Sequence, residues 1–205
     1  MLKVDKPGQI VILNGAPRSG KSSIAKVIQN SFEGIWMNLG VDRFMEMTPE
    51  KYQPGLGLRP GGERPDLEPI VNIMYRALYE TIAINCRLGL NIVVDVGHHE
   101  GHSIPLGILP NSARILTGLP VLFVGVLCPI EVVMERRLQT GYPSYTLEGK
   151  VPNAVSLWQQ LVHLPGVYDL EVDTSLLTPE ECAHLIRQRL KDGPPPIAFQ
   201  NIENM

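Results

Sequence analysis

The stretch that decides the fold of this chain is Gly15-Ala16-Pro17-Arg18-Ser19-Gly20-Lys21-Ser22. It has the Gly-x-x-x-x-Gly-Lys-Ser pattern of a phosphate-binding loop, whose glycines let backbone N–H groups turn inward around a β-phosphate. In this pattern the lysine reaches the β- and γ-phosphates, and the serine hydroxyl can bind Mg²⁺. We therefore expect a bound nucleotide to be held by Gly15, Ala16, Pro17, Arg18, Ser19, Gly20, Lys21, Ser22 and Ser23.

The segments on either side of this loop strengthen the prediction. Residues 9–14 form an apolar run of strand length, and residues 22–28 carry apolar side chains at helical spacing. A strand, a glycine loop and a helix in this order aim the helix N-terminus at an anion. A glycine-rich turn that arose by chance would not require a strand before it and a helix after it. The presence of both segments therefore favours a phosphate site.

The rest of the chain alternates short apolar runs with helical segments. The expected strands are residues 9–14, 35–39, 91–95, 121–127 and 168–172, and the expected helices are 20–31, 66–88, 103–118, 129–140, 151–163 and 178–191. The runs are almost continuously apolar, which is typical of parallel strands covered on both faces. This alternation predicts the α/β class, with a doubly wound five-stranded parallel sheet and helices on both faces. In such sheets ligands bind at the carboxyl ends of the strands.

Composition limits the classes of partner. The chain has 205 residues, of which 44% are hydrophobic, and a formal net charge of −3. This charge gives no reason to expect nucleic acid or an anionic membrane as a partner, and no apolar run approaches the roughly 20 residues of a membrane helix. Three widely spaced cysteines suggest buried, reduced thiols and a cytoplasmic protein. The sequence leaves open whether the chain forms a homo-oligomer.

Two segments depart from the regular alternation. Residues 48–69 are rich in Gly and Pro, and a connection this long favours a functional loop on the substrate side, which we expect to bury little apolar surface. The prolines at 194–196 end the last helix, and residues 197–205 are expected to be extended or disordered. The expected organisation is one domain over residues 1–192, with a lid at 136–150, followed by a C-terminal tail over 193–205.

Two aspartates follow predicted strands at the edge where ligands bind. Asp95 ends the run 91–95 and could hold Mg²⁺ together with Ser22, or it could be a turn or helix-capping residue. Asp42 follows the second strand and could accept the proton of an attacking hydroxyl group. It could equally be the N-cap of a short helix over residues 43–47.

Several segments occur together in the order of a known family. They are Leu39-Gly40-Val41-Asp42, the Gly/Pro-rich insert, Gly89-x-Asn91-Ile92-Val93-Val94-Asp95, Val124-Gly125-Val126-x-Cys128 and Gly166-Val167-Tyr168-Asp169-Leu170-Glu171-Val172-Asp173-Thr174. With the phosphate loop, they make the chain resemble the chloramphenicol phosphotransferase-like family of small kinases over about residues 9–190. The resemblance implies transfer of a phosphoryl group from ATP, with Mg²⁺, to a hydroxyl group of a small molecule.

The resemblance also implies roles for individual residues. Lys21 matches the lysine of the phosphate loop and Asp42 matches the catalytic base of the family, while Arg136 matches an arginine near the lid that approaches the phosphates. Asp173 and Thr174 match the segment near the adenine. The chain departs from the family where further lid arginines are replaced by Thr140 and Pro143, and where the paired aspartates at the third strand are replaced by Asp95-Val96.

These departures leave other functions open. A chain with few lid arginines could bind nucleotide with weak or lost turnover and act as a sensor or partner module. A nucleoside or nucleotide kinase would share the same fold. The acceptor pocket is expected between residues 43–69 and 97–112, whose apolar side chains favour a partly apolar acceptor.

Histidines gather in the second of these loops. His98, His99 and His102 surround Glu100, which suggests a metal site. Adjacent histidines rarely point at one ion, however, so a substrate pocket or a surface loop is the favoured interpretation.

Overall fold

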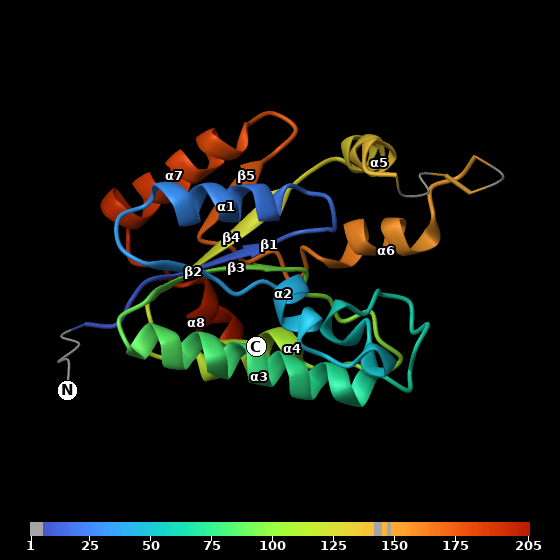
Figure 1. The fold of residues 1–205 in the computed structure, drawn as a ribbon, viewed down its shortest axis with the longest axis horizontal. Coiled ribbons are helices and arrows are strands. Elements are labelled where there is room, and N and C mark those ends of the chain that lie inside the picture. Colours follow the sequence, from blue (N-terminus) through green and yellow to red (C-terminus); the bar gives the residue numbers. More distant parts are fainter. Residues whose placement is uncertain (1–5, 142–144, 147–148) are drawn as a thin grey trace.

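The computed structural model describes residues 6–141, 145–146 and 149–205 (Figure 1). Within these ranges no helix is both long enough and apolar enough to cross a membrane.

The centre of the molecule is a five-stranded sheet with every pair of neighbouring strands parallel. The strands are β1 (Ile10–Asn14), β2 (Trp36–Asn38), β3 (Asn91–Val96), β4 (Val121–Leu127) and β5 (Leu170–Asp173), in the spatial order β2-β3-β1-β4-β5. All five residues of β1 are buried, because this central strand is covered on both faces. The predicted doubly wound parallel sheet is confirmed.

Helices cover both faces of the sheet (Figure 1). On one face lie α1 (Lys21–Ser31) and α7 (Pro179–Asp192), and on the other lie α3 (Glu68–Arg87), α4 (Ile108–Ile115) and α8 (Ala198–Glu203). At the carboxyl ends of the strands are α2 (Val41–Glu46), the short 3₁₀ turns η1 (Glu50–Tyr52) and η2 (Gly55–Gly57), α5 (Ile130–Gln139) and α6 (Asn153–Leu161). The connections that could form a site therefore gather at one edge of the sheet.

The helix expected over residues 103–118 is shorter in the structure. Both carboxylate oxygens of Glu100 accept backbone hydrogen bonds, from Leu106 and Gly107 at 2.9 and 3.0 Å and from Ile108 at 3.0 Å. These N–H groups lie at the start of α4, where a helix has unpaired donors. Because Glu100 satisfies them from outside, α4 begins only at Ile108.

The prediction of an extended or disordered tail is wrong. The prolines do end α7 at Asp192, but the chain then forms α8, whose residues Phe199 and Ile202 are buried. The Phe199 ring packs edge-on against Phe123 of β4, with centroids 5.0 Å apart. Asp169 Oδ1 accepts hydrogen bonds from the N–H groups of Ile197 and Ala198 at 2.8 and 3.1 Å. The tail thus completes one face of the core.

The expectation that the insert over residues 48–69 buries little apolar surface is also wrong. Leu56 and Leu58 are buried in the same core cluster as α3. The Leu58 carbonyl accepts a hydrogen bond from His99 Nε2 at 3.0 Å, and the Gly61 N–H donates to the Gly101 carbonyl at 2.8 Å. The insert is therefore a packed wall beside the site, held to the loop that follows β3.

Candidate active site

The phosphate loop joins the end of β1 to the start of α1, as the sequence predicts. Gly20 has φ +93°, a left-handed conformation that glycine adopts without strain. Gly15 lies so close to β4 that a Cβ atom there would be 2.5 Å from the Val126 carbonyl oxygen. Arg18 also has a positive φ, +71°, which is uncommon for a residue with a side chain. These backbone requirements explain both glycines of the motif.

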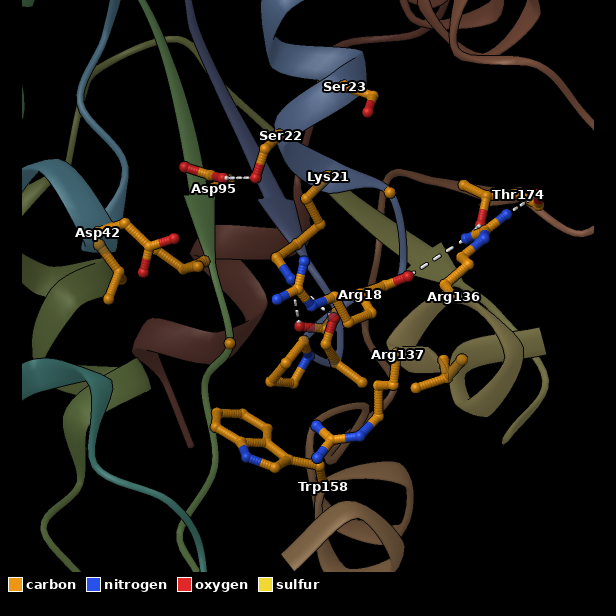
Figure 2. Close-up of a pocket in the computed structure, with 18 of the residues that line it drawn as sticks. Arg18, Lys21, Ser22, Ser23, Asp42, Asp95, Arg136, Arg137, Trp158 and Thr174 are labelled. Carbon is orange, nitrogen blue, oxygen red and sulfur yellow. Dashed lines mark hydrogen bonds between the residues drawn. The ribbon is translucent and has the colours of Figure 1, made fainter. Parts of the chain in front are cut away.

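The loop borders a cavity of about 700 Å³ (Figure 2). Its wall includes most of the predicted nucleotide-binding residues: Gly15, Ala16, Pro17, Arg18, Gly20, Lys21, Ser22, Ser23 and Thr174. Ser19 and Asp173 do not line it. The Ser19 residue of the loop is buried, and Asp173 accepts hydrogen bonds from the backbone and hydroxyl of Ser175 at 2.8 and 2.6 Å.

Lys21 is held by the loop to which it belongs. Its ammonium group donates to the carbonyl oxygens of Gly15 and Ala16, both at 2.8 Å. Burial lowers the pKa of Lys21 to about 8, although the nearby charges of Asp95 and Asp42 act in the opposite direction. At neutral pH the side chain is therefore mostly a cation, placed where a bound phosphate could replace the carbonyl contacts.

Ser22 and Asp95 form a pair of oxygen ligands at the edge of the sheet. The Ser22 hydroxyl donates to Asp95 Oδ2 at 2.6 Å, although the two residues belong to α1 and β3 (Figure 2). Asp95 lies inside β3, so the alternative of a turn or capping aspartate is wrong. Carboxylate and hydroxyl oxygens suit a hard cation such as Mg²⁺.

Gly40 makes room for this pair. A Cβ atom on Gly40 would lie 1.7 Å from Asp95 Oδ1, a distance that no structure can accommodate. The backbone angles of Gly40, φ −73° and ψ 164°, are open to any residue. Residue 40 must therefore be glycine because the Asp95 carboxylate of β3 occupies the space that a Cβ atom would need. The backbone conformation of Gly40 does not require glycine.

Asp42 faces the same cavity from the first turn of α2. Gly40 is the N-cap of α2, so the alternative of Asp42 as the N-cap is wrong. Partial burial and the charges of Asp95 and Glu46 raise the pKa of Asp42, while Lys21 and Arg18 oppose the rise. A carboxylate with a raised pKa is a better proton acceptor than an ordinary surface aspartate.

Arg136 connects the loop to the sheet. Its guanidinium donates to the Thr174 hydroxyl and carbonyl at 3.0 and 2.6 Å, and to the Arg18 carbonyl at 3.3 Å (Figure 2). The Thr174 hydroxyl in turn donates to the Ser19 carbonyl at 2.7 Å. Arg136 therefore fixes the shape of the phosphate loop from the β5 side, and its predicted approach to the phosphates stays a prediction.

The sequence analysis missed Trp158 of α6, which contributes to the cavity wall. A Cβ atom on Gly97 would meet the Trp158 ring at 2.7 Å, so the indole covers the turn after β3. It also packs in a cluster with Ala16 of the phosphate loop. No local pattern marks this tryptophan, because its neighbours come from distant parts of the chain.

Positive charge dominates the described part of the cavity. Its wall carries five basic side chains, two acidic side chains and no others with a formal charge: Arg18, Lys21, Arg59, Arg136 and Arg137, with Asp42 and Asp95. Such an excess attracts an anionic ligand and strengthens the case for a polyphosphate. Of the lid expected over residues 136–150, Arg136, Arg137, Gln139 and Thr140 line the cavity. Residues 142–144, with Pro143, and residues 147–148 lie outside the described residues.

The histidine loop holds no metal cluster among the described residues. His98 and His99 are buried, so the alternative of a surface loop is wrong for both. Burial lowers the pKa of His98 to about 3 and that of His99 to about 4. Both imidazoles are therefore neutral at neutral pH.

These two histidines predict a loss of stability in mild acid. In the unfolded chain an imidazole takes up a proton near pH 6.5, whereas the folded pKa values lie near 3 and 4, so the unfolded state binds more protons between these limits. Stability should be full above about pH 6.5 and should fall as the pH drops toward 4, with each histidine costing about 2 kcal/mol at pH 5. Urea unfolding at pH 7 and pH 5 measures this difference.

The contribution of one histidine can be isolated by substitution. His98→Phe should reduce the difference in unfolding free energy between pH 7 and pH 5 by about 2 kcal/mol. His184→Gln, on the exposed side of α7, should leave the difference unchanged. An unaltered difference in His98→Phe would show that His98 is not buried as a neutral group.

Sequence comparison relates the chain to a known family. The family model described as chloramphenicol phosphotransferase-like protein matches residues 8–191. A protein of Mycobacterium tuberculosis, provisionally described as an O-phosphotransferase, is 25% identical over 213 aligned residues, which cover 95% of this chain and 88% of the relative.

Solved structures share the fold. The tunicamycin resistance protein of Deinococcus radiodurans superposes with a TM-score of 0.62 and 16% identity, over 90% of this chain and 96% of that one. The APS kinase CysC of Mycobacterium tuberculosis, in complex with AMPPNP and APS, superposes with a TM-score of 0.61 and 17% identity, over 91% and 99% of the two chains. With the family match over nearly the whole sequence, the chain belongs to the chloramphenicol phosphotransferase-like family and is a kinase.

Proposed function

We propose that this kinase transfers the γ-phosphoryl group of MgATP to a hydroxyl group of a small molecule. The observation that carries the proposal is the meeting of three groups in one cavity: Lys21 of the phosphate loop, the Ser22–Asp95 pair and the carboxylate of Asp42. The first two suit a metal-bound polyphosphate, and the third suits an alcohol that must lose a proton.

Each residue has a separate task in this proposal. The backbone of the loop and Lys21 would hold the phosphates, and Ser22 and Asp95 would hold Mg²⁺, which supplies positive charge against the phosphate oxygens. Asp42 orients the acceptor hydroxyl and accepts its proton as the new oxygen–phosphorus bond forms, while the bond from the γ-phosphorus to the β–γ bridging oxygen breaks and ADP leaves. Arg136 keeps the loop in shape through Thr174.

The acceptor side of the cavity is built from α2, the insert and α3. Val41, Leu56 and Tyr75 give it an apolar wall, and Arg59 adds one cation. Of the loop expected over residues 97–112 only Gly97 lines the cavity, where Trp158 covers it. This lining supports an acceptor with an apolar body, and chloramphenicol is one candidate because of the family name. Three free, buried cysteines support the proposal of a cytoplasmic protein.

The direct test is ADP release from MgATP in the presence of alcohols, including chloramphenicol, aromatic alcohols and nucleosides. Acceptor-stimulated release is expected with at least one compound that has an apolar body. ATP binding with no stimulated release across the panel would favour a nucleotide-binding protein without turnover. Stimulation by nucleosides alone would favour a nucleoside kinase.

A shared metal site predicts non-additive losses. Ser22→Ala and Asp95→Asn should each weaken Mg²⁺-dependent ATP binding, since each removes an oxygen from the same ion. The double variant should lose less than the sum of the two losses, with a coupling of about 0.5–3 kcal/mol. Isothermal titration with MgATP and with metal-free ATP measures this coupling, and the metal-free titration is the control. Strict additivity with MgATP would contradict a common ion.

A further inference from the structure

The helix α3 carries apolar side chains on two faces. Its inner face packs in the core through residues such as Tyr79 and Ile82, which are fully buried. Its outer face also carries large apolar side chains, because Ile73, Ile84 and the C-cap Leu88 are 69%, 57% and 59% exposed. Packing against the sheet accounts for the inner face alone. A single exposed apolar residue is common on protein surfaces, but a second apolar face on one helix calls for something to cover it.

The exposed apolar residues of α3 form one stripe. Ile73, Ala77, Ile84 and Leu88 are separated by one or two whole helical turns, so they share one side of the helix. Ala77 is also exposed, and its short side chain would let another helix approach closely. In Figure 1 α3 forms the lower edge of the molecule, with no other helix or strand outside it. The stripe is therefore open to a partner.

Two residues of opposite charge, Arg76 and Glu80, border this stripe. Both are exposed and they lie one turn apart, yet neither forms an ion pair with the other or with any other described residue. Exposed ion pairs add little to affinity, but the arrangement of charges decides which partner and which orientation fit a surface. A matching partner would offer a glutamate to Arg76 and an arginine to Glu80.

A second copy of α3 meets this requirement when the two helices run antiparallel. If Ile73 packs against Ile84 of the second copy, Ala77 lies opposite Glu80 at the middle of the contact. Arg76 then lies beside Glu80 of the second copy, and the two-fold symmetry repeats every contact. In a parallel pair each residue would face its own copy, so like charges would meet. The charges therefore favour the antiparallel arrangement.

We propose that the stripe on α3 is a homodimer interface, in which α3 packs antiparallel against α3 of a second copy of this chain. The contact covers the four apolar side chains of each copy and pairs each Arg76 with a Glu80. Because each copy contributes a single helix, the interface is small and the dimer should be weak and dependent on concentration. No stripe residue lines the described wall of the active-site cavity, so the proposal does not depend on phosphoryl transfer.

Sedimentation velocity at increasing concentrations of the full chain tests the proposal. The wild type should pass from monomer to dimer. Arg76→Glu and Glu80→Arg should each raise the dissociation constant about 10-fold, since each replaces two attractive pairs by two repulsive ones. An equimolar mixture of these two variants should dimerise about as tightly as the wild type, because every introduced charge then meets its opposite. Such recovery on mixing is specific to an antiparallel pair of this chain.

Two further variants separate this interface from other effects. Ile84→Glu removes an apolar contact and should also weaken the dimer about 10-fold. Lys26→Glu reverses an exposed charge on α1, on the other face of the sheet, and should dimerise as the wild type does. Far-UV circular dichroism of the diluted samples checks that each variant folds.

Three results would overturn the proposal. A wild type that stays monomeric at every concentration would leave the stripe to a partner other than this chain. A dimer that is unchanged in Ile84→Glu would have its interface elsewhere. A mixture of Arg76→Glu and Glu80→Arg that dimerises no better than either variant alone would exclude the antiparallel pairing.

Discussion

Asp42→Asn should lower phosphoryl transfer by about 10²–10⁴-fold, the usual range for loss of a general base. The amide keeps the size of the carboxylate but cannot accept the proton of the acceptor hydroxyl. Affinity for MgATP should change little, because Lys21, Ser22 and Asp95 supply the proposed nucleotide and metal contacts. Steady-state ADP release with an acceptor from the panel, together with titration of MgATP, measures both quantities.

The matched control for this variant lies one helical turn away. Glu46→Gln in α2 makes the same change of charge on a side chain that does not line the cavity. It removes one of the charges that raise the pKa of Asp42 but leaves the Asp42 carboxylate in place, so turnover should fall far less than in Asp42→Asn. Asp42 is not the N-cap of α2, so a general loss of helix stability cannot explain a large effect. Near-normal turnover in Asp42→Asn would show that Asp42 is not the catalytic base.

Lys21→Ala should weaken MgATP binding by roughly 10- to 100-fold, because a charged hydrogen-bonding group contributes about 1.5–3 kcal/mol. Among the described residues, the hydrogen bonds of the ammonium group go to the loop carbonyls of Gly15 and Ala16, so its removal should leave the fold intact. Isothermal titration measures the affinity, and thermal unfolding without nucleotide checks the fold.

Lys26→Ala is the matched control, since Lys26 lies on the exposed side of the same helix. It should bind MgATP as the wild type does. Equal affinities in Lys21→Ala and Lys26→Ala would contradict the assignment of the phosphate site.

The features that the sequence predicted well depend on neighbours in the chain. The phosphate loop was recognised because Gly15 and Gly20 stand at fixed spacing between a strand and a helix. The sheet followed from short, continuously apolar runs, which are needed when both faces of a strand are covered. Boundaries were less accurate where a distant side chain acts, as at α4, where the Glu100 carboxylate occupies the N–H groups before Ile108.

In the site, too, the sequence could place residues that belong to a local pattern but not contacts between distant segments. Lys21 and Ser22 could be placed from the motif alone, and Asp95 from its position at the end of a strand. The sequence could not show that Arg136 turns toward Thr174, because the two residues meet only when β5 is packed beside β4. Nor could it reveal Trp158, which reaches the site from α6.

The sequence by itself determined the parallel sheet, the phosphate loop and the two carboxylates near the carboxyl ends of its strands, because local spacing and backbone conformation specify them. Only the tertiary structure decided why residue 40 must be glycine and how the tail closes the core. Each of these depends on contacts between side chains far apart in the chain, such as Asp95 against Gly40 and Phe199 against Phe123. Close packing fixes such contacts to fractions of an ångström, and no local pattern of residues encodes them.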